Sequence, residues 1–240
     1  MTEILPNWNL KDFYTSHEDP QIEKDIISFK EFVSSFSKKY NGKVLEFFQN
    51  FDDVILEFED GCEISAKLEC YAFLIYATNM NDSKIVQFYQ KISEEMTEVS
   101  GDLIFFTNTI NNFSDKDFEK ALTNTIKYKS WLINIRRFSK HQLSEESERI
   151  LLDKSMTANS SWVRFFEEKI NDLKFLIDNK EVNSSEALNL LTDQDGSIRK
   201  KASESIGSVF KANAKIFTFI TNTLAKDKII NDKWRNYANP

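Results

Sequence analysis

Turn-forming residues are scarce in this sequence of 240 residues. It contains five glycines and three prolines, and no proline stands between Pro20 and Pro240. A β-sandwich or β-barrel needs many turns rich in glycine and proline, so the composition excludes nearly every all-β fold. Long apolar runs are also missing, because stretches such as Cys70–Ala77 are far shorter than the ~20 residues of a membrane-spanning helix. The N-terminus lacks the basic and apolar regions of a secretory signal, so we expect a soluble cytoplasmic protein without a membrane partner.

Residues that carry chemistry are equally few. Cys62 and Cys70 form neither a disulfide framework nor a zinc knuckle, and we interpret both as buried free thiols of a reducing compartment. His17 and His141 are the two histidines, and the sequence has no HExxH motif. The glycines are too dispersed for a phosphate-binding loop. The sequence therefore predicts no catalytic, cofactor-binding or metal-binding residue in this chain.

Charge argues against a nucleic-acid partner. The chain has 38 acidic and 31 basic residues, a net charge of −7, which repels phosphate. We interpret the basic run at Arg136–Arg137 as the C-terminal turn of a helix, where the helix dipole favours cations. The run Arg199–Lys201 follows acidic residues, and we expect it to pair within its own helix.

Adjacent glutamates offer candidate pairs of carboxylates for acid–base chemistry. Neighbouring residues on a helix point about 100° apart, so two such carboxylates cannot share one proton site. We expect these pairs to lie on solvated helix faces. They are Glu94–Glu95, Glu145–Glu146 and Glu167–Glu168.

Apolar residues, 41% of the chain, recur at helical spacing. Asp19 and Pro20 begin the first helix, and Asn41 and Gly42 end it. The segment Val54–Phe58 is compatible with a strand, but helical spacing continues to Ile75, so we favour a helix. The Phe-rich stripes follow the same period and are expected to form the core.

Further starts and breaks divide the rest of the chain into helices. Acidic or hydroxyl caps stand before each predicted start, and one strand–turn–strand is predicted over Lys174–Val182 with its bend at Asp178–Asn179. The predicted starts are Asp82 (a helix that runs through Gly101 to Ile110), Ser114, Ser144, Ser184 or Ser185, and Asp193–Asp195; the predicted breaks are Lys127–Lys129 and Thr157–Asn159.

Together these patterns predict an all-α fold, a layered helical array with one short β-hairpin near residues 173–183. Residues 1–18 are expected to form an extended lead-in and residues 19–240 a helical lobe. The lead-in carries apolar anchors that are expected to lie along the body of the protein: Trp8, Leu10, Phe13 and Tyr14.

A set of segments occurs in a fixed order along nearly the whole chain. They are Trp8–Tyr14 with Asp19-Pro20 and Asp25, Tyr71–Ala77, Ile135–Phe138 with His141–Glu146, Ser161–Glu167, Ala187–Leu191 with Arg199–Ala202, and Asn222–Lys228. Taken together, they resemble the N-terminal half of oligoendopeptidase F, a family of cytoplasmic zinc metallopeptidases in the thimet-oligopeptidase-like group.

This resemblance implies the lobe that forms a wall of the substrate channel. In the family, the HExxH helix and a third ligand, a Glu, lie downstream of the region that this chain resembles, and zinc would activate water there with a Glu as base. The chain is therefore expected to be inactive alone, as a truncated gene product or an expressed fragment. It would meet an oligopeptide substrate only with a catalytic lobe, for example a second chain carrying HExxH, and would expose an apolar face to that lobe. The alternative is a stand-alone helical module that binds another protein.

Overall fold

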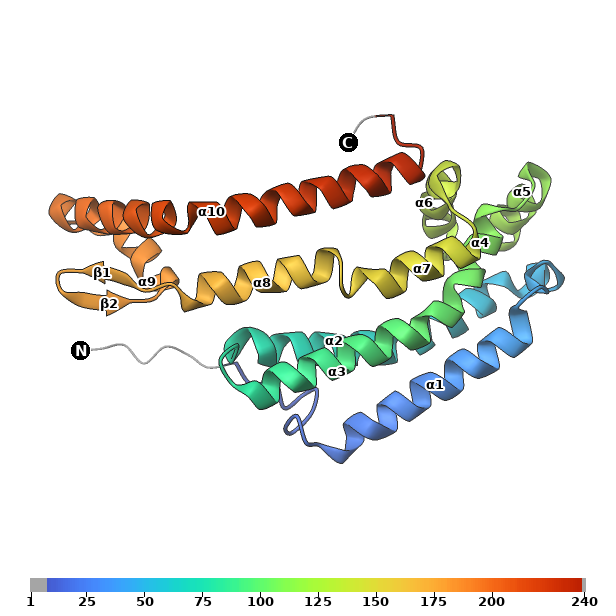
Figure 1. The fold of residues 1–240 in the computed structure, drawn as a ribbon. Helices are drawn as coiled ribbons and strands as arrows, with labels where there is room; N and C mark the ends of the chain where they lie inside the picture. Colours follow the sequence, from blue (N-terminus) through green and yellow to red (C-terminus); the bar gives the residue numbers. More distant parts are fainter. Residues whose placement is uncertain (1–7, 239–240) are drawn as a thin grey trace. The chain divides into compact units, whose positions relative to one another are not determined.

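The computed structural model describes residues 8–238 and confirms an all-α fold with one short hairpin (Figure 1). The chain divides into two compact units, Met1–Asp153 and Lys154–Pro240, which are described separately below. The predicted division into a lead-in over 1–18 and a helical lobe over 19–240 stays a prediction, and residues 1–7 of that lead-in lie outside the described part. No helix in the described part is long and apolar enough to cross a membrane.

The first unit is built from helices in series. Short 3-10 turns at Val44–Asn50, Gly101–Leu103 and Ser139–His141 join some of them. The helices are α1 (Pro20–Tyr40), α2 (Phe51–Thr78), α3 (Ser83–Ser100), α4 (Ile104–Asn111), α5 (Asp115–Asn124), α6 (Lys129–Phe138) and α7 (Glu145–Ser155), the last of which begins in this unit.

Most helix boundaries follow the predicted caps. The side chains of Asp19, Asp82 and Ser114 each accept a hydrogen bond from a backbone N–H of the first turn that follows. The helix α1 ends at Tyr40, and Gly42 then takes a φ of 74°, a conformation that glycine adopts without strain. The predicted break near Lys127–Lys129 is confirmed, because α5 ends at Asn124 and α6 begins at Lys129.

Two uncertain stretches of the first unit are resolved by the structure. The segment Val54–Phe58 is helical and lies within α2. The predicted helix through Gly101 to Ile110 is interrupted, because the turn Gly101–Leu103 is a 3-10 helix that separates α3 from α4. Gly101 and Leu103 are both buried in this turn.

Aromatic residues dominate the core of the first unit. Phe36 on α1 is fully buried, and its ring lies 5.2 Å from that of Phe106 and 5.6 Å from that of Phe58, measured between centroids. Both are distances at which aromatic pairs attract one another. The expectation that the Phe-rich stripes form the core is confirmed for α1, α2 and α4.

Polar contacts attach the segment before α1 to the helices. Tyr14 is buried and donates a 2.7 Å hydrogen bond to Asp25 on α1, and Lys67 on α2 lies 3.0 Å from the same carboxylate. Leu10 and Phe13 pack against the core as expected. The prediction for Trp8 is wrong, because its side chain is 67% exposed and does not anchor the segment.

We expect Asp25→Asn to lower the free energy of unfolding at pH 7 by about 1–2 kcal/mol, because it removes the ionised carboxylate that accepts these hydrogen bonds. Burial alone would raise the pKa of Asp25, but hydrogen bonds from Tyr14, Gln21 and Lys67 together hold it below its usual value. The carboxylate therefore stabilises the fold fully above the unfolded-state pKa of about 4, and this stabilisation is lost as pH falls through the lower folded-state pKa. Urea denaturation from pH 7 to pH 2.5 should show wild type and variant converging in acid.

The exposed carboxyl of Asp12, in the same segment, provides the control for this prediction. Asp12→Asn should change the free energy of unfolding by less than about 0.5 kcal/mol at each pH. A stability difference for Asp25→Asn that does not narrow in acid would contradict the assigned role of the carboxylate.

The second unit places a hairpin and a short helix beside two longer helices. It contains α8 (Asn159–Asp172), β1 (Phe175–Ile177), β2 (Lys180–Val182), α9 (Ser184–Asn189), a 3-10 turn (Leu190–Thr192) and α10 (Gly196–Trp234). In Figure 1 the hairpin and α9 lie at the N-terminal end of α10, and α8 runs alongside α10. Its core is small and consists of Leu173, Phe175, Ile177, Val182, Ala187 and Ala202.

The predicted hairpin is confirmed and its turn is where the sequence placed it. Phe175 pairs with Val182 and Ile177 with Lys180 in antiparallel register. Asp178 and Asn179 take φ values of 50° and 62°, which asparagine and aspartate tolerate better than most residues.

The predicted cap of α9 is wrong by one residue. Asn183, and not Ser184 or Ser185, accepts a hydrogen bond from the N–H of Glu186, and the Glu186 carboxylate accepts one from the N–H of Asn183. This reciprocal pair is a capping box, which satisfies two backbone donors at once. Asp195 caps α10 as predicted.

Candidate functional site

The histidines and cysteines do not come together in a reactive cluster. No group of three His, Cys, Asp or Glu residues within the described range 8–238 could hold a metal ion. Cys70 is exposed, so the expectation that both thiols are buried is wrong for it. Cys62 is partly buried, and burial, with a smaller effect of Glu59, raises the pKa of its thiol to about 11. A thiol with that pKa stays protonated near neutral pH and is a poor nucleophile.

The first basic cluster has a structural role. Arg136 and Arg137 lie in the last turn of α6, as predicted. In addition, the Arg136 guanidinium donates to the carbonyl oxygens of Asn111 and Phe113, at 2.6 and 2.8 Å. These carbonyls belong to the end of α4 and the turn after it, which an arginine stabilises by hydrogen bonding.

The second basic cluster pairs within its helix less than predicted. Lys200 pairs within the helix, 3.9 Å from Glu204 one turn later, and not with the acidic residues before the run. Lys201 instead reaches Asp178 of the hairpin turn at 2.5 Å. Arg199 donates to the backbone carbonyls of Asp193 and Gln194, before the helix begins.

One predicted solvated carboxylate is in an ion pair between helices. Glu95 on α3 accepts a 2.9 Å hydrogen bond from Lys30 on α1, and Lys91 lies 3.6 Å away. Its side chain is only 25% exposed. The solvated-face prediction is therefore wrong for Glu95, because the packing of α1 against α3 brings a lysine to it.

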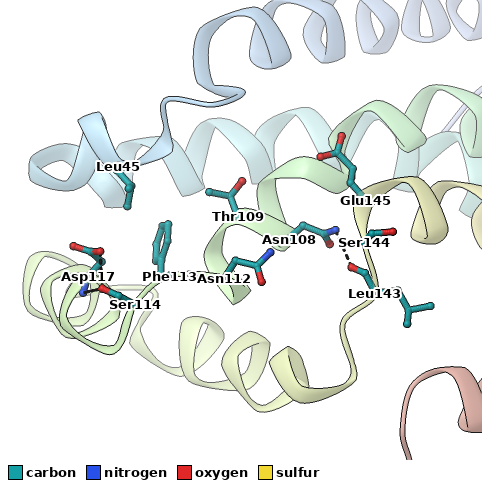
Figure 2. Close-up of a pocket in the computed structure, with 10 residues that line it drawn as sticks. All are labelled: Leu45, Asn108, Thr109, Asn112, Phe113, Ser114, Asp117, Leu143, Ser144 and Glu145. Atoms are coloured by element: carbon teal, nitrogen blue, oxygen red, sulfur yellow. Dashed lines mark hydrogen bonds between the residues drawn. The ribbon is translucent and has the colours of Figure 1, made fainter.

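A polar pocket of about 350 Å³ lies in the first unit (Figure 2). In Figure 2, Ser114 and Asp117 lie at one end, Ser144 and Glu145 lie at the other, and residues of α4 lie between them. No basic residue lines the pocket. The lining residues are Leu45, Asn108, Thr109, Asn112, Phe113, Ser114, Asp117, Leu143, Ser144 and Glu145.

The hydroxyls of this pocket serve as helix caps. Ser114 accepts a hydrogen bond from the N–H of Asp117 and donates to its carboxylate, and Ser144 accepts from the N–H of Ser147. No histidine lines the pocket, and the carboxylate that accepts from Ser114 is a weak base, because that hydrogen bond holds the pKa of Asp117 below its usual value.

Two asparagines near this pocket are buried, and each has an unsatisfied side-chain oxygen. Asn108 and Asn111 are both 5% exposed, and the Oδ1 atom of each has no hydrogen-bond partner. Their amide N–H groups donate to Leu143 and Gln142, respectively. Asn108 also lines the pocket, whereas Asn111 does not. The pocket therefore lies at a junction of helices, and its serine hydroxyls serve as caps.

A second hollow, which we call the aromatic groove, lies between α8 and α10 of the second unit. Its volume is about 710 Å³. The ring of Trp162 lies 5.5 Å from that of Phe219 and 6.4 Å from that of Phe165, and the two phenylalanines are 60% and 45% exposed. The lining residues are Trp162, Phe165, Lys215, Ile216, Thr218, Phe219 and Asn222.

The sequence pattern does not predict this groove, because helical spacing assigns the Phe-rich stripes to the core. One signal was available. Phe219 stands four residues after Lys215 and three before Asn222, on the polar side of the long helix and not on its apolar stripe. In the structure Phe219 joins Trp162 and Phe165, and exposed apolar residues that cluster in this way mark interaction surfaces.

Comparisons with known proteins agree with this fold. A family model described as Oligopeptidase F matches residues 110–175. No curated protein matches the sequence. The crystal structure of oligoendopeptidase-F from Enterococcus faecium matches with a TM-score of 0.76 and 21% identity, over 91% of this chain and 45% of that chain. The chain thus spans less than half the length of that relative, shares its fold, and resembles the N-terminal region of oligoendopeptidase F, as the sequence predicted.

Proposed function

We propose that this chain is the substrate-channel-forming part of an oligoendopeptidase F-like zinc metallopeptidase. In this proposal it takes part in the hydrolysis of oligopeptides only when the remainder of that fold is present. The observation that carries the proposal is the structural match, which covers nearly all of this chain and less than half of the relative.

The zinc that the family resemblance implies does not fit the residues of this chain. Its histidines, His17 and His141, belong to no cluster of three possible ligands within residues 8–238. A catalytic zinc needs three protein ligands and an open position for water. The ligands and the base would therefore come from the remainder of the fold, for example from a second chain that carries HExxH. The proposal includes a cytoplasmic location and neither a membrane nor a nucleic-acid partner.

We expect the purified chain to show no cleavage of a quenched fluorogenic oligopeptide with Zn²⁺ above a metal-free blank. The reason is that water activation needs the missing ligands. The Enterococcus faecium enzyme serves as the positive control for peptide and metal. Co-expression of this chain with the part of that enzyme outside the matched region tests complementation, and zinc-dependent cleavage by the pair alone would support the proposal. Turnover by the isolated chain would contradict it.

The alternative function is a stand-alone helical module that binds another protein. The aromatic groove favours it, since exposed aromatic residues in a hollow are typical of recognition surfaces. A cooperatively unfolding monomer that gains no activity on co-expression would favour this alternative over the incomplete peptidase.

A further inference from the structure

The helix α10 carries a charge opposite to that of the whole chain. It has eight basic and three acidic residues, a net charge of +5 in a chain of −7. Ser205–Lys226, a span of six helical turns, contains no acidic residue. This long basic stretch forms one wall of the aromatic groove.

The lysines of this stretch lie on the groove side of the helix. Lys211, Lys215 and Lys226 share one helix face with Phe219, because they are spaced by four, four and seven residues. All three lysines are exposed, and none forms an ion pair within the described residues 8–238. Lys215 is the one charged residue that lines the groove, so no carboxylate there neutralises it.

We propose that the aromatic groove binds an acidic peptide segment. An apolar side chain of the peptide inserts among Trp162, Phe165 and Phe219, and carboxylates beside it pair with the lysines of α10. Buried aromatic anchors surrounded by complementary charge are the usual source of affinity and selectivity in peptide grooves. A hollow lined by rings suits an inserted apolar side chain better than a flat bilayer, and an inorganic polyphosphate has no apolar group to insert there.

This inference goes beyond the proposed function, because binding in the groove needs neither zinc nor a catalytic residue. It is tested by fluorescence anisotropy with the full chain, without added metal. The probe is a fluorescein-labelled peptide that alternates Glu or Asp with Leu or Phe. Its matched control is the same peptide with Gln and Asn in place of the acids.

The acidic peptide should bind at least about tenfold more tightly than its amide control, and raising the salt concentration from 50 to 500 mM should weaken it markedly, since exposed charges are screened. Phe219→Ala should weaken binding about tenfold and Lys215→Glu about fivefold. Because both side chains are exposed, circular dichroism and the Tm should match wild type. Lys200→Glu on the same helix and Leu188→Ala, an exposed residue of α9, are the matched controls and should bind like wild type.

Several results would overturn the proposal. Equal affinity for the acidic and amide peptides would show that charge does not contribute to binding. Equal losses of affinity in Lys200→Glu and Leu188→Ala would show that the peptide does not bind in the groove. Binding to phosphatidylglycerol vesicles that exceeds peptide binding and is lost in Phe219→Ala would assign the surface to a membrane. A dimer, measured by light scattering, that Phe219→Ala dissociates would assign it to a second copy of the chain. None of these outcomes depends on peptide cleavage, so failure here is distinguishable from failure of the proposed function.

Discussion

Gly61→Val is expected to lower the free energy of unfolding by about 2–3 kcal/mol, as overpacking of a tight contact does. Gly61 lies in the middle of α2, where it faces Phe32 of α1, and a Cβ atom added there would overlap the Phe32 ring. That ring stacks on Phe29 at 6.3 Å and contacts Phe36 at 5.4 Å between centroids, so it cannot make room for the added atoms without shifting against both neighbours. Such a shift loosens the packing of the aromatic core where α1 meets α2.

A second helical glycine provides the control for this prediction. Gly207 lies in α10, and a Cβ atom added there meets nothing within 4 Å. Gly207→Ala should therefore raise the free energy of unfolding by about 0.5–1 kcal/mol, through the lower backbone entropy of the unfolded chain and the better helix propensity. Urea denaturation followed by circular dichroism measures both variants. Similar changes in the free energy of unfolding for the two variants would show that Gly61 does not pack tightly against Phe32.

Phe36→Ala should have the largest effect of any single truncation in the first unit, about 3–5 kcal/mol. The side chain is fully buried, and its ring contacts those of residues from three helices: Phe32, Tyr40, Phe58, Phe105 and Phe106. Truncation removes the transfer free energy of the ring and leaves a cavity that these rings cannot fill without leaving their own contacts. We expect a lower denaturation midpoint and weaker near-ultraviolet circular dichroism.

The truncation of an exposed apolar residue is the comparison for Phe36. Ile126 stands between α5 and α6 and is 88% exposed. Ile126→Ala should change the free energy of unfolding by less than about 0.5 kcal/mol, because almost no area is removed from water there on folding. If Phe36→Ala proved as mild as Ile126→Ala, the aromatic cluster would not be the centre of the core.

Features that depend on a few neighbouring residues were predictable from sequence. A cap such as Asp19 needs only the free N–H groups of its own first turn, and the turn at Asp178–Asn179 needs only residues that tolerate a positive φ. The helical nature of Val54–Phe58 followed from apolar spacing over one helix. The cap of α9 was misplaced by one residue because Asn183 and Ser184 are both good caps, and only the partner Glu186 selects between them.

Features that depend on distant neighbours could not be read from the pattern. The sequence pattern places Glu95 on the surface, but the packing of α1 brings Lys30 to it. The pattern predicts a buried Cys70, but on α2 this residue is exposed to solvent. Trp8 is apolar, but its side chain is 67% exposed. The polar pocket is lined by residues as far apart in the sequence as Leu45 and Glu145, so no local motif predicts it.

By itself, the sequence determined the fold class, most helix boundaries, the hairpin and the resemblance to oligoendopeptidase F, because these rest on local hydrogen bonds, helical periodicity and ordered motifs. Only the tertiary structure decided which aromatic residues enter the core and which line a groove. Phe36 and Phe219 are both phenylalanines on helices, but one faces neighbouring helices and the other faces water on the same helix face as three lysines. Burial is a property of what packs against a side chain, and periodicity carries no information about that partner.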